Sequence, residues 1–220
     1  MPFAPLPKLR SQLVAISHRL HQNGWVANHD GNLSVRLKGG RLLITCTSIS
    51  KRDVEDASLL VVDMEGKLLE GRGRPFSELE LHLAAYGARP EVDAVLHAHP
   101  PNATAWGLAG LELGPIAMPE VVVSLGERIP TVPRFLPKDA EGPRRVAAQA
   151  AQHDAMLLSG NGALTLGVDL TQALLRMELV EHYAKILGTA LSLGPVAPLS
   201  RAELDVLLDA RRKAGLGPRK

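Results

Sequence analysis

The chain is organised around one stretch, Ala94-Val95-Leu96-His97-Ala98-His99-Pro100-Pro101. Its small and apolar residues predict a short buried strand, which the two prolines end. Side chains of a strand alternate between its faces, so His97 and His99 point the same way and Ala98 the opposite way. Two imidazoles on one rigid edge can bind one metal ion, at metal–nitrogen distances of about 2.0–2.1 Å. The alternative is that both histidines only form hydrogen bonds at a strand end.

The composition is that of a globular chain without a nucleic-acid-binding surface. Apolar residues make up 45% and charged residues 22% of the 220 residues, which is near the average of globular domains. The net charge is +2, and arginines and lysines are scattered instead of forming the basic face that nucleic acids need. We therefore expect no nucleic-acid partner.

The single cysteine and the N-terminal residues indicate the cellular compartment in which we expect the protein. One cysteine, Cys46, gives no disulfide framework and fits a reducing compartment. Its apolar neighbours are typical of a small buried side chain. The first eight residues lack the apolar core of a signal peptide, and no apolar stretch reaches the ~20 residues of a membrane span. The expectation is a cytoplasmic protein without a membrane partner.

Hydrophobic patterns divide the chain into the strands and helices of one α/β domain. Alternating or continuously apolar runs predict strands, and apolar residues at helical spacing, such as Leu9, Leu13 and Ile16, predict helices. The expected strands are 33–37, 41–45, 59–63, 94–99, 129–132, 155–158 and 163–166, and the expected helices are 8–23, 77–88, 101–108, 142–153, 170–193 and 200–214. We expect a single domain over residues 1–220, with a core of about 8–193, a C-terminal helix at about 200–214, and helices on both faces of a mixed sheet.

An acidic residue stands at the start of the helix before the histidine strand. Ser77-Glu78-Leu79-Glu80 matches a capping box, with Ser77 as N-cap and Glu80 reaching back to it. Glu78 then lies in the first turn, where the helix dipole favours an ionised carboxylate. A carboxylate close upstream of the two histidines suits a metal site with mixed oxygen and nitrogen ligands. The alternative is that Glu78 only complements the helix dipole.

Several ordered pieces of the chain resemble the class II aldolase/adducin family. They are Gly31-Asn32-Leu33-Ser34-Val35-Arg36; Ile44-Thr45-Cys46-Thr47-Ser48; Ser77-Glu78 with His82 and Ala84-Ala85-Tyr86; residues 94–99; and Asn161-Gly162-Ala163-Leu164-Thr165-Leu166-Gly167, which leads to Glu178, Glu181 and Ala184. A lone His-x-His is weak evidence, but this set spans residues 10 to 190 in the order and spacing of the family.

The resemblance implies a fold, an assembly and a metal site. The fold is a three-layer α/β/α sandwich with a central mixed, largely antiparallel sheet, and the assembly is a homotetramer with active sites between subunits. A divalent metal, most often Zn²⁺, is held by three histidines, of which His97 and His99 are two. A glutamate at the position of Glu78 is the catalytic acid and base. The cation acts as a Lewis acid that stabilises an enediolate when a carbon–carbon bond breaks.

The third metal position departs from the family. Asn161 stands where the family has its third histidine, so the implied metal residues of this chain are His97, His99 and Asn161. Asparagine is a weak neutral oxygen ligand that suits zinc poorly. A water molecule, Glu78 or the helical His182 are open alternatives for completing the set.

The substrate pocket departs from the family as well. The family binds phosphate with turn residues and hydroxyls that correspond here to Gly31, Asn32, Thr47, Ser48 and Ser77. Phe76 replaces a hydroxyl of that set, and Pro119 takes the place of a catalytic tyrosine. The apolar bulk of Phe76 favours a smaller acid group, or one without phosphate, and the missing tyrosine favours the alternative chemistries of the family.

The sequence therefore predicts a metal-dependent aldolase-type lyase that cleaves a small hydroxy-carbonyl compound of carbohydrate metabolism. Decarboxylases, dehydratases and epimerases use the same site in this family and stay open as alternatives. A non-catalytic binding and assembly module, like adducin, is the alternative from a different class of protein.

Overall fold

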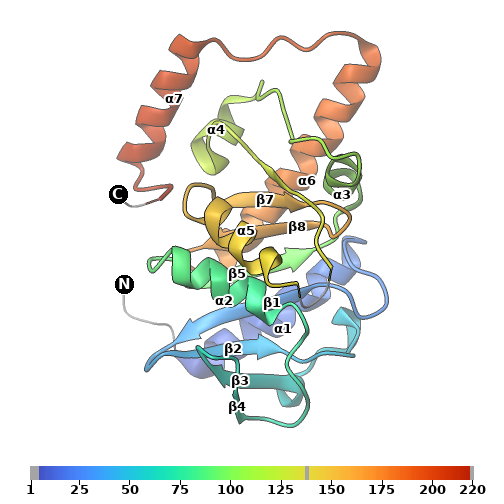
Figure 1. The fold of residues 1–220 in the computed structure, drawn as a ribbon, viewed down its shortest axis with the longest axis vertical. Coiled ribbons are helices and arrows are strands. Elements are labelled where there is room, and N and C mark those ends of the chain that lie inside the picture. The colour runs from blue at the N-terminus through green and yellow to red at the C-terminus, as the bar shows by residue number, and fades with distance from the viewer. Residues whose placement is uncertain (1–4, 137–138, 219–220) are drawn as a thin grey trace.

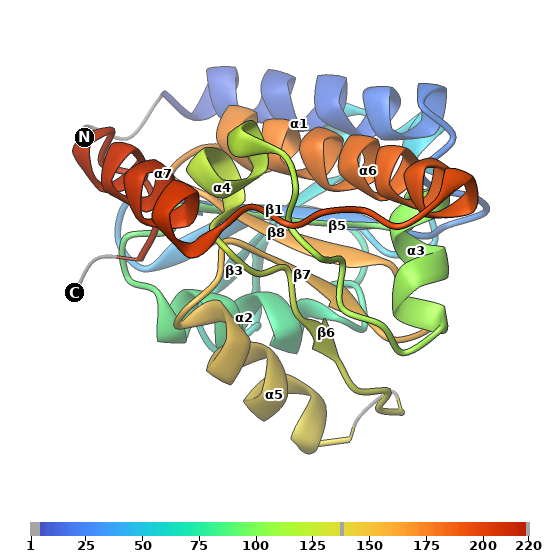
Figure 2. The same ribbon diagram turned by 90° about the horizontal axis from the view of Figure 1, so that it is seen from above.

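Three layers, a sheet between two sets of helices, make up the computed structural model, which describes residues 5–136 and 139–218. Figure 2 shows the layers from the side: helices α1 and α6 lie on one face of the sheet, and α2 and α5 lie on the other. This arrangement confirms the expected α/β/α sandwich. No helix in the described ranges is both long enough and apolar enough to cross a bilayer.

Eight strands in the described residues form one mixed sheet in the order β4-β3-β2-β1-β5-β8-β7-β6. They are β1 (Asn32–Leu37), β2 (Arg41–Thr45), β3 (Leu59–Asp63), β4 (Leu68–Glu70), β5 (Ala94–Ala98), β6 (Thr131–Val132), β7 (Ala155–Leu158) and β8 (Ala163–Gly167). Neighbouring strands are antiparallel, except that β6 and β7 are parallel. The sheet is thus largely antiparallel, as expected, and β5 lies at its centre (Figure 1).

Seven α-helices of the described chain surround the sheet. They are α1 (Leu6–Gln22), α2 (Leu79–Ala88), α3 (Pro101–Leu108), α4 (Pro119–Leu125), α5 (Glu141–Ala150), α6 (Leu170–Leu193) and α7 (Arg201–Lys213), and two short 3-10 turns, η1 (Lys51–Asp53) and η2 (Asp56–Ser58), follow β2. α6 packs against β8 and β5, and α7 packs against α4.

The alternation of side chains along each strand produces two separate cores. In β3, Leu59 and Val61 join the core under α1 and α6, whereas Leu60 and Val62 join the core under α2 and α5. The sheet is buried on both faces, so its strands read as almost continuous apolar runs. In β5 the same rule directs Ala98 toward α1 and α6, and His97 toward α2. The predicted orientation of the histidine strand is confirmed.

Some expected boundaries are wrong, and the capping box at Ser77 is the most informative case. Helix α2 begins at Leu79, with Glu78 in the N-cap position and no side-chain cap. The main-chain N–H of Leu79 instead donates to the carbonyl of Phe76 at 3.2 Å, so Ser77 lies in a turn before the helix. A capping box is present at the start of α7, where Ser200 is the N-cap and Glu203 reaches back to it.

Two elements were not predicted, and one is shorter than expected. Strand β4 and helix α4 are short apolar runs. Neither is long enough for the alternation of a strand or the 3.6-residue repeat of a helix to be recognised in the sequence. Strand β6 has two residues where four were expected. It is a parallel edge strand, which needs its partner β7 to form at all.

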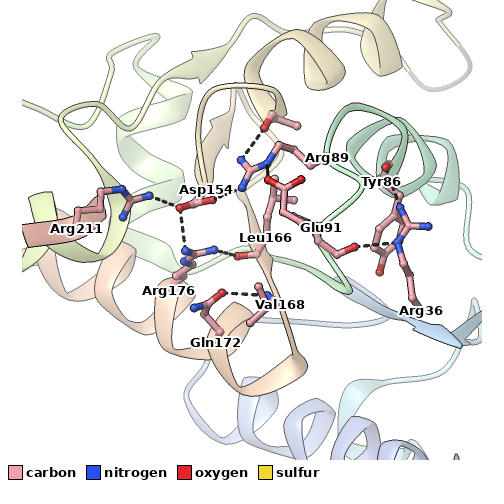
Figure 3. Close-up of polar contacts among 12 residues, drawn as sticks. Arg36, Tyr86, Arg89, Glu91, Asp154, Leu166, Val168, Gln172, Arg176 and Arg211 are labelled. Carbon is pink, nitrogen blue, oxygen red and sulfur yellow. Dashed lines mark hydrogen bonds and ion pairs between the residues drawn. The ribbon is translucent and has the colours of Figure 1, made fainter. Parts of the chain in front are cut away.

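A buried ion cluster ties three helices to the sheet (Figure 3). Asp154 lies directly before β7, and its carboxylate contacts three arginine side chains. They are Arg89 at the end of α2, Arg176 in α6 and Arg211 in α7. Asp154 is fully buried. Arg89 also donates to Glu91 at 2.6 Å, so two carboxylates neutralise most of the charge of three guanidinium groups.

The buried lysine Lys51 should make stability depend on pH. Burial lowers the pKa of Lys51 from 10.5 to about 8, and the attraction of Asp30 opposes the shift. The unfolded chain then binds the lysine proton more tightly than the folded chain, so stability rises as pH goes from 8 toward 10.5. Between pH 7 and 9.5 we expect a gain of about 1–2 kcal/mol in the free energy of unfolding from this group. Urea denaturation of wild type and Lys51→Met at both pH values measures it, and an equal rise in the two proteins contradicts the assignment.

Candidate active site

Four segments that are far apart in the sequence meet at the end of strand β5. His97 lies in β5 and His99 directly follows it. Strand β1 pairs with β5 so that Asn32 stands opposite His97, and the turn before β8, the other neighbour of β5, carries Asn161. Helix α2 adds Glu78 at its N-cap. The four residues predicted for catalysis and metal binding, Glu78, His97, His99 and Asn161, are thus brought together.

Two side-chain amides hold the carboxylate of Glu78. Nδ2 of Asn32 donates to Oε2 at 2.8 Å, and Nδ2 of Asn161 donates to Oε1 at 2.5 Å. Oε2 also lies 3.5 Å from Nε2 of His97. One donor on each oxygen fixes the plane of the carboxylate. Asn161 therefore acts here as a hydrogen-bond donor to Glu78, and its predicted role as a metal ligand stays a prediction.

The charge state of the site follows from burial and close neighbours. Burial alone would raise the pKa of Glu78, but the nearby His97 ring and the amides of Asn161 and Asn32 outweigh it and bring the pKa to about 2. Burial lowers the pKa of His82, one turn further along α2, to about 3, and the neighbouring His97 adds to the shift. At neutral pH the site thus combines an ionised carboxylate with a neutral buried imidazole.

His97 and His99 direct their Nε2 atoms at each other. The two atoms are 3.1 Å apart, and the rings are inclined by 80°. Two nitrogens bound to one tetrahedral ion lie about 3.3 Å apart, so this pair stands close to a chelating separation. Nδ1 of His97 is buried without a hydrogen-bond partner among the described residues. Nδ1 of His99 lies 3.7 Å from the carboxylate of Asp30, where a carboxylate can orient a ligating histidine.

These donors fit part of a metal site. In the described ranges no group of three or more histidine, cysteine, aspartate or glutamate side chains is arranged to hold a metal ion. The Nε2 atoms of His97 and His99 are separated by nearly the distance expected for two ligands of one ion. The Glu78 oxygen, 3.5 Å from Nε2 of His97, is at a similar separation. Catalytic metal sites leave positions open for water or substrate. The donor set therefore suits a divalent cation at an open site more than a closed structural one.

Two glycines allow the backbone to approach this closely. Gly162 has a φ of +72°, and a Cβ there would overlap the carbonyl oxygen of Ala98 and the ring of His99. Gly31 has a φ of +73°, and a Cβ there would lie 2.6 Å from Val26 and 3.1 Å from the carbonyl oxygen of His97. Only glycine adopts this conformation at no steric cost. Gly31, predicted for substrate binding, thus has a clear role in packing against β5.

A cavity of about 450 Å³ opens on Glu78 and Asn161. Its lining residues are Ser77, Glu78, Glu80, Leu81, Leu108, Arg134, Phe135, Leu136, Asp139, Pro143, Ser159, Gly160 and Asn161. His97 is not among them, and only 1% of its side chain is exposed. A substrate that enters the cavity therefore meets Glu78 and Asn161, whereas His97 is covered and the side chain of His99 is 28% exposed without lining the cavity.

The residues predicted for substrate binding are only partly brought together. Ser77 lines the cavity, and Asn32 is buried with its amide on Glu78. Thr47 and Ser48 follow β2 and are not among the lining residues. His182, an alternative third ligand, is exposed on α6 and lines a different cavity.

Sequence reasoning missed one wall of the cavity. Arg134, Phe135 and Leu136 come from the segment after β6, and Ser159 comes from the end of β7. No local pattern marks these residues, because they reach the site only through the parallel pairing of β6 with β7. The predicted strand near 129–132 was the sole available signal that this segment joins the sheet.

Fold and site together define a class of protein: a three-layer α/β/α domain with a carboxylate and two histidines at the end of its central strand. The family model described as Class II Aldolase and Adducin N-terminal domain matches residues 11–187. The chain belongs to this family, as the sequence indicated.

Known relatives carry two kinds of enzyme name. The 3-oxo-tetronate 4-phosphate decarboxylase of Escherichia coli K12 is 33% identical over 183 residues, which cover 81% of this chain and 85% of the relative. The L-fuculose phosphate aldolase of the same strain is 31% identical over 210 residues, which cover 95% and 96% of the two chains. A solved structure of L-fuculose 1-phosphate aldolase is 25% identical, covers 95% of this chain and 98% of its own, and superposes with a TM-score of 0.87. These relatives are enzymes, and lyase activity is consistent with both names.

Proposed function

We propose that this chain is a divalent-metal-dependent lyase that breaks a carbon–carbon bond beside a carbonyl group in a small sugar-derived substrate. One observation carries the proposal: Glu78, held by two amides, has an oxygen 3.5 Å from Nε2 of His97, which lies 3.1 Å from Nε2 of His99. A carboxylate and two imidazoles at this spacing have no evident structural purpose. The lyase names of the relatives support the same class of reaction.

His97 and His99 would hold the cation, with Zn²⁺ as the proposed metal. When bound, a divalent cation supplies a Lewis acid that stabilises negative charge developing on substrate oxygens. Glu78 lines the cavity, and Asn32 and Asn161 keep its carboxylate in one orientation. It can therefore accept a proton from a substrate hydroxyl in an aldol cleavage and return a proton to the carbon that keeps the electron pair.

Decarboxylation is the second candidate, and the tyrosines favour it. An aldol cleavage moves a proton from the hydroxyl that becomes the aldehyde to the carbon that keeps the electron pair. The family has a catalytic tyrosine that corresponds here to Pro119, so in this chain Glu78 alone would have to make both transfers. The chain has two tyrosines. Tyr86 and Tyr183 are both 1% exposed, with hydroxyls bonded to Ser34 and to the carbonyl of Pro115. Neither can reach an active site, in this chain or in a second copy of it.

Decarboxylation of a 3-oxo acid requires fewer proton transfers from the site than cleavage of an aldol. The bond to the carboxylate carbon breaks, CO₂ leaves, the electron pair stays on the carbon beside the ketone, and one proton then adds to that carbon. No base has to remove a hydroxyl proton. The proton comes from a water molecule, whose hydroxide combines with the CO₂ to give bicarbonate, and the ionised carboxylate of Glu78, oriented by Asn32 and Asn161, can hold that water beside the carbon.

The direct test is turnover of the two relatives' substrates by the purified protein. We expect Zn²⁺-dependent release of CO₂ from 3-oxo-tetronate 4-phosphate, or of an aldehyde from L-fuculose 1-phosphate, and loss of turnover on chelation. Failure to turn over either compound, together with no uptake of Zn²⁺, Mn²⁺ or Co²⁺, contradicts the proposal.

The Glu78→Gln variant should lower kcat about a hundredfold, since a positioned proton-transfer group contributes roughly 10²–10⁴. Glutamine keeps the shape but carries no charge. Steady-state kinetics measure the effect. Glu80→Gln is the matched control, because Glu80 lines the same cavity but is exposed and lies two residues further along α2. Equal losses in the two variants argue against a catalytic role for Glu78.

The Asn161→His variant should bind metal about tenfold or more tightly, because an imidazole is a stronger zinc ligand than an amide. Competition with a chelating dye measures the affinity. Unchanged affinity contradicts the idea that position 161 faces the metal. A loss of turnover with tighter metal binding is expected, since the new side chain no longer donates to Glu78.

We also propose a homotetramer in the cytoplasm, as the family resemblance implies. Support for assembly comes from four large apolar side chains exposed along α6, Leu175, Ile186, Leu191 and Leu193, because exposed apolar patches often mark interfaces. Light scattering measures the mass of the assembly.

A further inference from the structure

We propose that Arg134 is the anion-binding residue of this site and holds an oxyanion group of the substrate, a carboxylate or a phosphate, against the wall of the Glu78 cavity. The inference rests on the proposed function and adds the residue that recognises the charged end of the substrate.

The backbone of Arg134 is anchored to the sheet. Val132 pairs with Leu158 in the parallel β6–β7 ladder, and the N–H of Ser159 donates to the carbonyl of Val132 at 3.0 Å. The carbonyl of Arg134 itself accepts a hydrogen bond from Arg145 in α5 at 3.4 Å. These bonds hold the backbone of Arg134 beside the turn that carries Asn161.

The guanidinium group lies against the backbone of Gly160. A Cβ built at Gly160 would be 3.1 Å from Nη2 and 3.3 Å from Nε of Arg134. A side chain at position 160 would thus compete with the guanidinium for this place. Gly160 directly precedes Asn161, and Arg134, Asn161 and Glu78 all line the same cavity.

Within the described residues the guanidinium of Arg134 has no hydrogen-bond or ion-pair partner, in contrast to Arg89, Arg176 and Arg211. It is also the only arginine or lysine among the described residues that line the cavity, which include Glu78, Glu80 and Asp139. An anionic substrate would be repelled by these carboxylates. The fork of donors on a guanidinium matches the two oxygens of a carboxylate or phosphate.

The other residues expected near a phosphate group do not line this cavity with a positive charge. Thr47 and Ser48, which the family resemblance assigns to phosphate, are not among the lining residues of the cavity. Phe76 is buried and apolar. Among the described residues that line this cavity, Arg134 is the one that can supply a positive charge to a substrate in contact with Glu78.

The test measures binding of two half-substrates to the Zn²⁺-loaded protein by calorimetry. Glycerol 3-phosphate presents a phosphate alone, and glycerate presents a carboxylate alone. Wild type is compared with Arg134→Gln and Arg134→Lys. Arg144→Gln is the control, because Arg144 is an exposed arginine of α5 that pairs with Glu141 and does not line the cavity.

We expect Arg134→Gln to raise the Kd of one probe about tenfold or more, Arg134→Lys to raise it less, and Arg144→Gln to leave it unchanged. The probe that is affected identifies the group that Arg134 holds. Equal Kd values for both probes in wild type and Arg134→Gln overturn the inference, and melting curves of the variants show whether each is folded. The binding readout needs no turnover, so it fails independently of the proposed lyase activity. If that activity is present, the KM of Arg134→Gln rises with a smaller change in kcat.

Discussion

The His97→Ala variant should lose divalent metal and lyase activity together. One of two imidazoles that face each other at 3.1 Å disappears, so a chelate becomes a single ligand. We expect metal affinity to fall about a thousandfold, which corresponds to about 4 kcal/mol. Turnover should fall at least as far, because the Lewis acid contributes several kcal/mol of charge stabilisation. Metal content after dialysis, with activity in the same samples, measures both losses.

A second histidine provides the matched control for this experiment. His182 is exposed on α6 and lines a cavity other than that of Glu78, so His182→Ala should keep stoichiometric metal and full turnover. A His97→Ala protein that still holds one metal per chain shows that the cation is bound elsewhere. The proposal of a His97–His99 chelate is then wrong, although membership of the family stands.

The part of the site that the sequence predicts well depends on strict local geometry. The period of two along a strand fixes that His97 and His99 share a face and that Ala98 does not, and β5 has that arrangement. Ordered motifs shared with the family then bring Glu78 and Asn161 to the same strand end. Neither step requires knowledge of how distant helices pack.

The parts that the sequence misses depend on competition or on long-range pairing. At Ser77 the local pattern favours a capping box, but the carboxylate of Glu78 is drawn to the amides of Asn32 and Asn161, and the helix starts one residue after it. Arg134 reaches the cavity only because β6 pairs in parallel with β7. A two-residue strand leaves no periodic signal in the sequence.

Asn32 makes a contact that motif matching cannot predict, while its assignment to substrate binding stays a prediction. The resemblance assigns it to substrate binding, whereas its Nδ2 is committed to Glu78 at 2.8 Å and its Oδ1 is buried without a partner in the described chain. Its side chain orients the carboxylate of Glu78 from the strand opposite His97. Together with Asn161 it makes the proposed proton-transfer group a fixed one.

The Asp154→Asn variant should be destabilised by about 3–5 kcal/mol, because removing one partner of a buried ion cluster leaves the others uncompensated. Asparagine keeps the shape of the side chain, but Arg89, Arg176 and Arg211 then lose the carboxylate that they share. The free energy of unfolding from urea denaturation measures the effect. Asp209→Asn is the control: Asp209 pairs with Arg212 and Lys213 on the surface of α7, where an ion pair contributes about 0–1 kcal/mol.

The same cluster should determine how firmly α7 is held. Arg211 is the residue of α7 that reaches Asp154, and its other nitrogen donates to the carbonyl of Val123 in α4 at 2.7 Å. Because the remaining side chains of α7 are exposed or only partly buried, loss of this contact should release the helix before the sheet unfolds. Hydrogen exchange of the α7 amides should therefore accelerate in Asp154→Asn and in Arg211→Met, and much less in Asp209→Asn. Uniform exchange rates across the three variants contradict the view that Asp154 anchors α7, and would assign that anchoring to the contacts of Leu204, Leu207 and Leu208 with the core.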